Sequence, residues 1–461
     1  LQRLFAPEAL PTTTARRVPL PPETSMESGG SRCAILRPGL PPAAMGGERR
    51  PHILIVNQHG ENRGDEAAMR AMLASFVDEL GEVDFTLLYQ FRDRGLRLSF
   101  KENVRDLPII IPPTEALGLV LFSGAKLGHA RLQSLLGPTT RQIIDAYERA
   151  DLVVSAPGGP YFGDIYRNHE LVHWFYIWLA SVYRKPAFLY ATSAGPFETP
   201  GLNAVRKHLY RKFDLLCTRE SLSAAHIEEL LGPGTQVHVT ADSALQQTFE
   251  PMPRESYFRG DRSHLAGKFL VAVSLLDFRY PGASDVDTRK RHYDATMIEA
   301  LSHLAAQRDC HFLFFPQLYG EVHQDAPYLE RMASRLPDDS SWEIVSTELA
   351  SDAHRELFAM SDFHVASRYH PAIFGNSGLT PGICIYYEHK ALGFMQQLGL
   401  ERLAFDIWDV QASELCDAID GALADRETLI ETLKQRIPLL CQLSRQTTKL
   451  AVSLLREGSS Q

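Results

Sequence analysis

An arginine and a histidine in the C-terminal half of the sequence form the strongest candidate for a catalytic site. Arg368 and His370 directly follow a predicted strand at 363–366. In an extended segment, residues two apart point to the same side. A neighbouring cation lowers the pKa of a histidine and a bound dianion raises it, which suits a proton donor that acts only when substrate is present. The pair predicts general acid catalysis on an anionic substrate, with an ordinary buried histidine as the alternative.

A second arginine lies at the end of another predicted strand. Arg219 follows the strand 215–218 and immediately precedes a helix. Its guanidinium group carries a permanent charge and a planar pair of donors that fit a carboxylate or a phosphate. We therefore expect Arg219 to bind an anionic group, and a structural ion pair with Glu220 is the alternative.

Acidic residues open the first predicted helix, after the strand 52–56. The segment Asn62 to Glu66 includes Gly64 and Asp65. A helix N-terminus attracts phosphate, but two carboxylates would oppose an anion there. The segment therefore predicts hydrogen bonds to sugar hydroxyls, or a general base. The alternative is that Asp65 caps the helix while Glu66 is solvated.

A glycine-rich turn follows the predicted strand 152–155. Gly158 and Gly159 allow the backbone to approach a ligand closely, and Asp164 follows them. The turn has neither of the common nucleotide-binding fingerprints. A ligand loop and a simple tight turn are both consistent with these glycines.

The elements that must position these residues alternate between short β-branched strands and amphipathic helices. This alternation is typical of βαβ units with a parallel sheet. In the first predicted helix the apolar residues recur with helical spacing. They are Met69, Met72, Leu73, Phe76 and Leu80. We expect an α/β protein with two Rossmann-like, doubly wound domains that face a cleft, where the carboxyl ends of the strands would hold the ligand.

Five segments are predicted along the chain. Residues 1–50 contain eight prolines and are expected to be a disordered extension. An N-terminal Rossmann-like domain is predicted over 51–248, a linker over 249–268 and a C-terminal Rossmann-like domain over 269–405. The tail, 406–461, is predicted to be helical, with an interruption at Pro438, and to pack back on the N-terminal domain.

Composition excludes several classes of protein. The 47 Lys and Arg against 56 Asp and Glu give a net charge of −9, which argues against nucleic-acid binding. The six cysteines lack metal-like spacing and predict reduced thiols and a cytoplasmic location. No apolar run is long enough to span a bilayer.

Taken together, the motifs resemble those of the polysaccharide pyruvyltransferase family over roughly residues 50–400. No single motif decides this, but their order and spacing are specific. Pro160 stands where the family has a third glycine. The matching elements are N-R-G-D-E at Asn62 to Glu66, Gly158 and Gly159 with Asp164, A-G-P at Ala194 to Pro196, R-E-S-L at Arg219 to Leu222, Asp242, F-P at Phe315 and Pro316, R-Y-H at Arg368 to His370, and Y-E-H-K at Tyr387 to Lys390.

The resemblance implies a glycosyltransferase-B-like fold and transfer of pyruvate from phosphoenolpyruvate to two sugar hydroxyls, as a cyclic ketal. In this scheme Arg219 and Arg368 hold the carboxylate and phosphate of the donor. His370 protonates the methylene carbon, Asp65 accepts a hydroxyl proton or orients the acceptor, and Lys390 steadies phosphate or acceptor. The scheme needs no cofactor and no metal.

Two other functions stay open at this point. A nucleotide-sugar glycosyltransferase would have the same fold. A non-catalytic member of a polysaccharide assembly complex is the other, although a scaffold does not require clustered cations beside a histidine. The acceptor glycan, its attachment to a lipid, peripheral contact with the inner face of the membrane and homo-oligomer formation are left undecided by the sequence.

Overall fold

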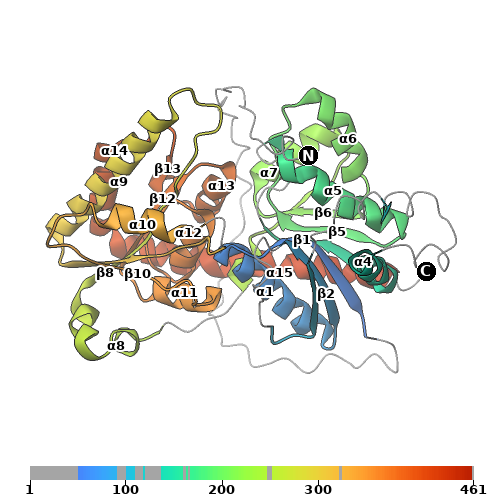
Figure 1. The fold of residues 1–461 in the computed structure, drawn as a ribbon, viewed down its shortest axis with the longest axis horizontal. Helices are drawn as coiled ribbons and strands as arrows, with labels where there is room; N and C mark the ends of the chain where they lie inside the picture. The colour runs from blue at the N-terminus through green and yellow to red at the C-terminus, as the bar shows by residue number, and fades with distance from the viewer. Residues whose placement is uncertain are drawn as a thin grey trace.

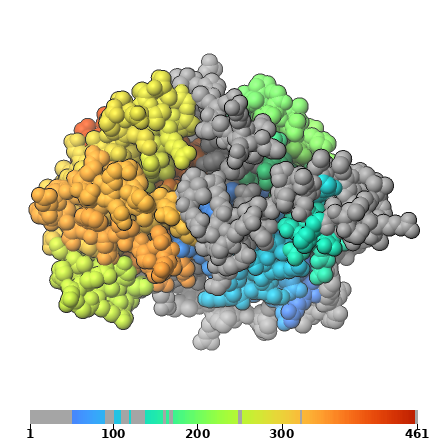
Figure 2. All heavy atoms as spheres, viewed as in Figure 1, coloured from blue at the N-terminus to red at the C-terminus, as the bar shows by residue number. Residues whose placement is uncertain are grey.

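The computed structural model describes residues 50–90, 100–108, 118–119, 137–158, 162–164, 167–246, 252–320 and 324–458. The predicted N-terminal extension, except for Arg50, and Gly159 of the glycine-rich turn lie outside these residues. Two parallel sheets, each covered by helices, form two domains that lie side by side (Figure 1). In the space-filling view, the yellow and orange C-terminal domain and the blue-to-green N-terminal domain occupy opposite sides of the molecule (Figure 2).

The N-terminal sheet has seven strands in the order β3-β2-β1-β4-β5-β6-β7. Every neighbouring pair is parallel. Helices cover both faces, so the central strands are apolar throughout rather than alternating. The strands are β1 (His52–His59), β2 (Asp84–Gln90), β3 (Val104–Pro108), β4 (Leu152–Ser155), β5 (Ala187–Thr192), β6 (Leu215–Thr218) and β7 (His238–Val239).

The two faces of strand β1 enter different cores. Ile53 and Ile55 pack in the core that also holds residues of α1 and α15, whereas Leu54 and Val56 pack in the core with α4, α5, α6 and α7. The predicted apolar face of the first helix is confirmed. Its residues Met69, Met72, Leu73 and Phe76 are buried in the core that also holds Ile53 and Ile55. The helices are α1 (Arg63–Leu80), α4 (Pro138–Arg149), α5 (Arg167–Val182), α6 (Pro200–Tyr210) and α7 (Ser221–Leu231).

The C-terminal sheet has six parallel strands in the order β10-β9-β8-β11-β12-β13. They are β8 (Phe269–Ser274), β9 (Cys310–Phe314), β10 (Ser341–Ile344), β11 (Phe363–Ala366), β12 (Gly382–Tyr386) and β13 (Ala404–Asp406). The helices of this domain follow its strands, so each strand leads into a loop at the same edge of the sheet. These helices are α9 (Val286–Gln307), α10 (Ala326–Ala333), α11 (Ser351–Ala359), α12 (Tyr369–Ser377), α13 (His389–Leu398) and α14 (Ala412–Ala424).

The segment predicted as a linker, 249–268, requires a correction. Within its described part lie the short helix α8 (Arg254–Tyr257) and the 3-10 helix η5 (Gly260–Gly267). Phe258 and Leu265 are buried in the core of the C-terminal domain. The segment contributes to that core because its two apolar side chains are removed from water there.

The prediction of a helix interruption at Pro438 is wrong. Helix α15 (Arg426–Gly458) continues through this proline and extends across both domains (Figure 1). It contacts β5 and β6 of the N-terminal sheet as well as α12, α13 and α14 of the other domain. Packing along its buried side maintains the helix although proline cannot donate a backbone hydrogen bond.

Candidate functional site

Loops from the carboxyl ends of the two sheets meet between the domains. After β1, the backbone of Asn62 forms an antiparallel bridge with Leu318, which follows β9. The amide of Arg63 donates to the carbonyl oxygen of Gln317 at 3.0 Å. Because both sheets are parallel, the loops that follow the strands of each sheet lie at one of its edges. At this junction Gly64, at the start of α1, lies against His370, at the start of α12.

The N-terminus of α1 is capped by Asn62, so the alternative in which Asp65 caps this helix is wrong. The side-chain oxygen of Asn62 accepts a hydrogen bond from the amide of Gly64 at 2.8 Å. The helix therefore begins at Arg63, and Asp65 lies inside its first turn, 6 % exposed. Asn62 matches the usual preference for a short polar side chain at this position.

Glu66 is neither solvated nor placed to contact a sugar. Its side chain is fully buried, and its two oxygens pair with Arg63 at 2.5 Å and with Arg70 at 2.8 Å. Arg63 also donates to the carbonyl oxygen of Thr347 and stacks on the ring of Tyr319, both in the C-terminal domain. Glu66 thus orients an arginine that joins the domains, because a buried carboxylate requires paired cations.

His370 lies across the domain junction from the start of α1. It occupies the first turn of α12, and Arg368 is the extended N-cap residue of that helix, so the two do not share an extended segment as the sequence suggested. A Cβ atom on Gly64 would lie 2.0 Å from Nδ1 of His370. A glycine is therefore required at position 64 for this approach.

The surroundings of His370 favour its neutral form. Burial of the imidazole lowers the pKa of His370 to about 3, Asp242 opposes this shift, and Arg219 and Lys390 add to it. Its Nε2 atom has no hydrogen-bond partner among the described residues and lies 3.8 Å from Oδ2 of Asp242. The cations that contribute to the low pKa of His370 are therefore Arg219 and Lys390, and not the neighbouring Arg368.

Arg219 is held by side chains of three segments. Its Nη1 donates to Asp242 at 2.7 Å and its Nε donates to Ser193 at 2.8 Å. The guanidinium also lies 4.3 Å from the ring centre of Tyr369. The ion-pair partner is thus Asp242 rather than Glu220, which instead caps α7. The remaining Nη2 atom is buried and has no hydrogen-bond partner within the described part of the chain.

The other two predicted cations also have carboxylate neighbours. Arg368 pairs with Asp325 at 2.5 Å, and Lys390 pairs with Glu388 at 2.6 Å. Lys390 lies 6.0 Å from the centre of the Tyr369 ring, which connects it to the surroundings of Arg219. Burial lowers the pKa of Lys390, but Glu388 and Tyr387 outweigh it, so its pKa is raised and the ammonium group stays charged.

Local sequence patterns gave no sign of three of these partners. Asp325 follows a loop rather than a strand, and its pairing with Arg368 spans 43 positions. Glu388 lies inside a matched motif but was not assigned a role. Gln317, which follows the matched Phe315 and Pro316, was not selected either. Asp242, the partner of Arg219, was also among the motif residues, but its pairing with Arg219 was not predicted.

The glycine-rich turn leads to a separate buried network. Asp164 accepts hydrogen bonds from Arg206 at 3.0 Å and from the Thr199 hydroxyl at 2.7 Å, and Arg206 also pairs with Glu170. Burial opposes ionisation of Asp164, but these donors outweigh it and lower its pKa. The carbonyl oxygen of Gly158 accepts from the Thr192 hydroxyl at 3.3 Å. These contacts of Asp164 stabilise the fold, which corrects its assignment to an acceptor loop.

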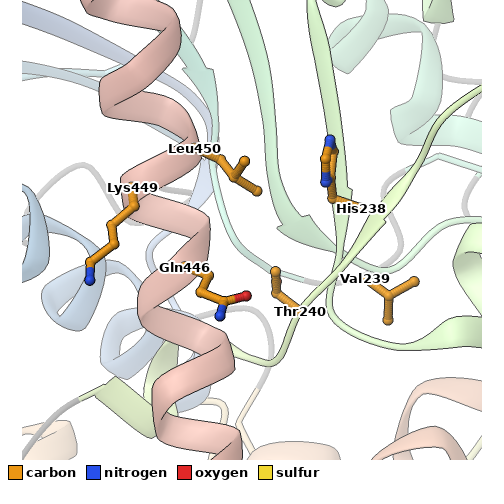
Figure 3. A pocket seen from close by; sticks show the side chains of 6 residues that line it. All are labelled: His238, Val239, Thr240, Gln446, Lys449 and Leu450. Carbon is orange, nitrogen blue, oxygen red and sulfur yellow. The ribbon is translucent and has the colours of Figure 1, made fainter. Parts of the chain in front are cut away.

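A pocket of about 280 Å³ lies elsewhere, between β7 and α15 (Figure 3). It includes none of the predicted site residues. Its lining residues are His238, Val239, Thr240, Gln446, Lys449 and Leu450. Among the residues that the structure describes, no group of three or more His, Cys, Asp or Glu side chains is arranged to hold a metal ion.

The architecture is that of the glycosyltransferase-B fold, as predicted. Sucrose-phosphate synthase from Thermosynechococcus elongatus matches with a TM-score of 0.54 and 14 % identity, covering 89 % of this chain and 100 % of that one. The α,α-trehalose 6-phosphate synthase from Burkholderia multivorans matches with a TM-score of 0.51 and 14 % identity, over 89 % and 98 % of the two chains. At these identities the similarity concerns the fold alone.

The family follows from the sequence matches. A family model described as polysaccharide pyruvyl transferase matches residues 62–389. AmsJ, an amylovoran biosynthesis protein of Erwinia amylovora, is 23 % identical over 407 residues, which cover 84 % of this chain and 95 % of AmsJ. The chain belongs to the polysaccharide pyruvyl transferase family, which confirms the resemblance seen in its motifs and makes it a transferase. No helix in the described part of the chain is long and apolar enough to cross a membrane.

Proposed function

We propose that the protein transfers pyruvate from phosphoenolpyruvate to two hydroxyl groups of a sugar, as a cyclic ketal, during the synthesis of a cell-surface polysaccharide. The observation that carries the proposal is His370, a buried imidazole whose Nε2 has no hydrogen-bond partner among the described residues, beside Arg219. The family and the similarity to AmsJ support the polysaccharide context.

Arg219, Arg368 and Lys390 are proposed to bind the donor. Each has a carboxylate neighbour in this structure, which fixes the orientation of its charged group. The buried Nη2 of Arg219 lacks a hydrogen-bond partner in the described residues and would gain one from a carboxylate or phosphate oxygen. Bound phosphoenolpyruvate would thus complete an arrangement that is incomplete in its absence.

His370 is proposed as the general acid. A dianion bound nearby raises the pKa of the imidazole, so His370 takes up a proton when phosphoenolpyruvate binds. Transfer of that proton to the methylene carbon forms the methyl group and leaves positive charge at C2. The first sugar hydroxyl attacks C2, and Asp65, at the start of α1, is proposed to accept its proton.

The second half of the reaction releases phosphate. The C2–O bond to phosphate breaks, and the second hydroxyl attacks C2 to close the ketal ring. Of the two hydroxyl protons, one replaces the proton that His370 gave to the methyl group and the other leaves with phosphate. The cations Arg219 and Lys390 stabilise the charge on the departing phosphate. The two substrates and the residues of the chain thus account for every proton and bond of the reaction, and no cofactor is needed.

The reaction is proposed to take place in the cytoplasm, on a glycan acceptor. The described cysteines support a reducing compartment, because each is a free thiol. They are Cys217, Cys310, Cys384, Cys416 and Cys441.

A thermal-unfolding titration with phosphoenolpyruvate, UDP and GDP tests the donor. At about 100 times its dissociation constant, phosphoenolpyruvate should stabilise the protein by roughly 2.7 kcal/mol. Arg368→Met should lose this stabilisation, whereas Arg289→Met, which alters an ion pair on α9, should retain it. Stabilisation by a nucleotide alone would replace the proposal with a nucleotide-sugar glycosyltransferase.

A further inference from the structure

The side-chain amide of Gln317 is buried and makes no hydrogen bond to the part of the chain that the structure describes. It lies three residues after the end of β9 and is 1 % exposed. Neither Nε2 nor Oε1 has a hydrogen-bond partner among the residues that the structure describes. Buried polar atoms are nearly always paired in folded proteins, so two unpaired atoms on one side chain require an explanation.

The backbone of Gln317 is fixed at the domain junction. The backbone N–H of Gln317 donates to Oδ2 of Asp325 at 3.0 Å. The other oxygen of this carboxylate, Oδ1, accepts from Arg368 at 2.5 Å. Its carbonyl oxygen accepts from the amide of Arg63 at 3.0 Å. Gln317 is therefore held between the start of α1 and the proposed donor-binding arginine.

Other glutamines in the structure make hydrogen bonds to the protein. Nε2 of Gln246 donates to the carbonyl oxygen of Ser444 at 2.8 Å and to the hydroxyl of Tyr190 at 3.2 Å. Nε2 of Gln397 donates to two backbone carbonyl oxygens, at 3.0 and 3.1 Å. Gln317 differs from both because neither end of its side-chain amide is hydrogen-bonded to a described residue.

The chemistry of an amide indicates which ligand it would bind. Nε2 is a donor and Oε1 is an acceptor. The carboxylate and the phosphate dianion of phosphoenolpyruvate are acceptors only and would leave Oε1 unpaired. Adjacent hydroxyls of a sugar satisfy both ends, since one accepts from Nε2 while the other donates to Oε1.

We propose that Gln317 binds adjacent hydroxyl groups of the acceptor sugar and contributes to acceptor specificity. This inference rests on the proposed function, because it assigns the acceptor side of the same site. It places the acceptor next to Arg368, between the two domains.

Gln317→Leu tests the assignment, because leucine removes both polar atoms and is similar in size. We expect an unfolding midpoint that is unchanged or higher, and unchanged stabilisation by phosphoenolpyruvate. The matched control is Gln246→Leu, which breaks hydrogen bonds of the fold and should lower the midpoint. A lower midpoint for Gln317→Leu, as large as that of the control, would overturn the proposal.

The activity measurement uses phosphate release from phosphoenolpyruvate with the methyl glycosides of galactose, glucose and mannose. Gln317→Leu should raise KM for the reactive glycoside at least tenfold while KM for phosphoenolpyruvate stays within twofold. Equal effects on both substrates, or none, would overturn the proposal, as would a wild-type protein that binds phosphoenolpyruvate but responds to no glycoside. Absence of phosphoenolpyruvate binding by the wild-type protein would instead reject the proposed function, and the comparison of unfolding midpoints would still decide whether the amide serves the fold.

Discussion

Gly64 and His370 belong to different domains, yet a Cβ atom on the glycine would lie 2.0 Å from the imidazole Nδ1. Gly64→Ala should therefore displace the ring or separate the domains locally. We expect destabilisation by about 1–3 kcal/mol, as for other overpacked sites, and loss of most pyruvate transfer. Urea unfolding and the phosphate-release assay measure the two effects.

Gly201→Ala is the matched control for that substitution. Gly201 lies in α6, and a Cβ atom there would meet no atom within 4 Å. Alanine should leave activity unchanged and stabilise the helix by up to about 1 kcal/mol. Equal behaviour of the two alanine variants would contradict the close packing of Gly64 on His370.

The buried pair of Arg219 and Asp242 should be sensitive to the loss of either charge. In the folded protein Nη1 of Arg219 lies 2.7 Å from Oδ2 of Asp242. Asp242→Asn keeps the shape of the side chain but leaves the guanidinium group without a carboxylate partner. Breaking a buried ion pair in this way costs about 3–5 kcal/mol. Urea unfolding should reveal this loss.

A double variant separates the charge effect from packing. Arg219→Met removes the unpaired cation that Asp242→Asn leaves behind, so the double variant should be more stable than Asp242→Asn alone. Additive losses would show that the two side chains do not act as a pair.

The proposed general acid predicts proton uptake when the donor binds. The pKa of His370 is about 3 in the free protein, below its ordinary value of 6.5, and a bound anion raises it. Binding should therefore take up protons, and the affinity for phosphoenolpyruvate should rise as pH falls from 8 toward 6. Calorimetry in two buffers of different ionisation enthalpy measures the uptake, which His370→Gln should reduce.

The same shift affects stability with a definite sign. The unfolded chain binds more protons than the folded one between about pH 3 and pH 6.5, so the contribution of His370 to stability rises with pH over this window and is lost as pH falls. His370→Gln should reduce the slope by at most about 1.4 kcal/mol per pH unit. A slope and a proton uptake equal to those of the wild-type protein would place the titrating group elsewhere.

Pro438 offers a prediction that does not involve the site. It is exposed and lies inside α15, where it removes one backbone hydrogen bond. Pro438→Ala should raise the free energy of unfolding by about 1–3 kcal/mol and leave binding of phosphoenolpyruvate unchanged. A lower unfolding midpoint would mean that the helix is shaped around the proline.

The architecture was accessible from the sequence because periodicity is a local property. Alternating strands and amphipathic helices predicted two parallel sheets, and the helical spacing from Met69 to Phe76 gave the buried face of α1. Pro438 and the segment 249–268 were misread for one reason. Long-range packing sustains a helix through the proline and draws Phe258 and Leu265 into the core.

Residue types and motif order by themselves determined the family, and placed Arg219, Arg368 and His370 just after the ends of strands. Only the tertiary structure decided how these groups are paired. Arg219 pairs with Asp242 rather than with Glu220, and Arg368 pairs with Asp325. The absence of a side chain at Gly64 leaves room for the ring of His370. These contacts join segments far apart in the chain, and parallel sheets bring such segments together at their carboxyl edges, where spacing along the sequence carries no information on distance.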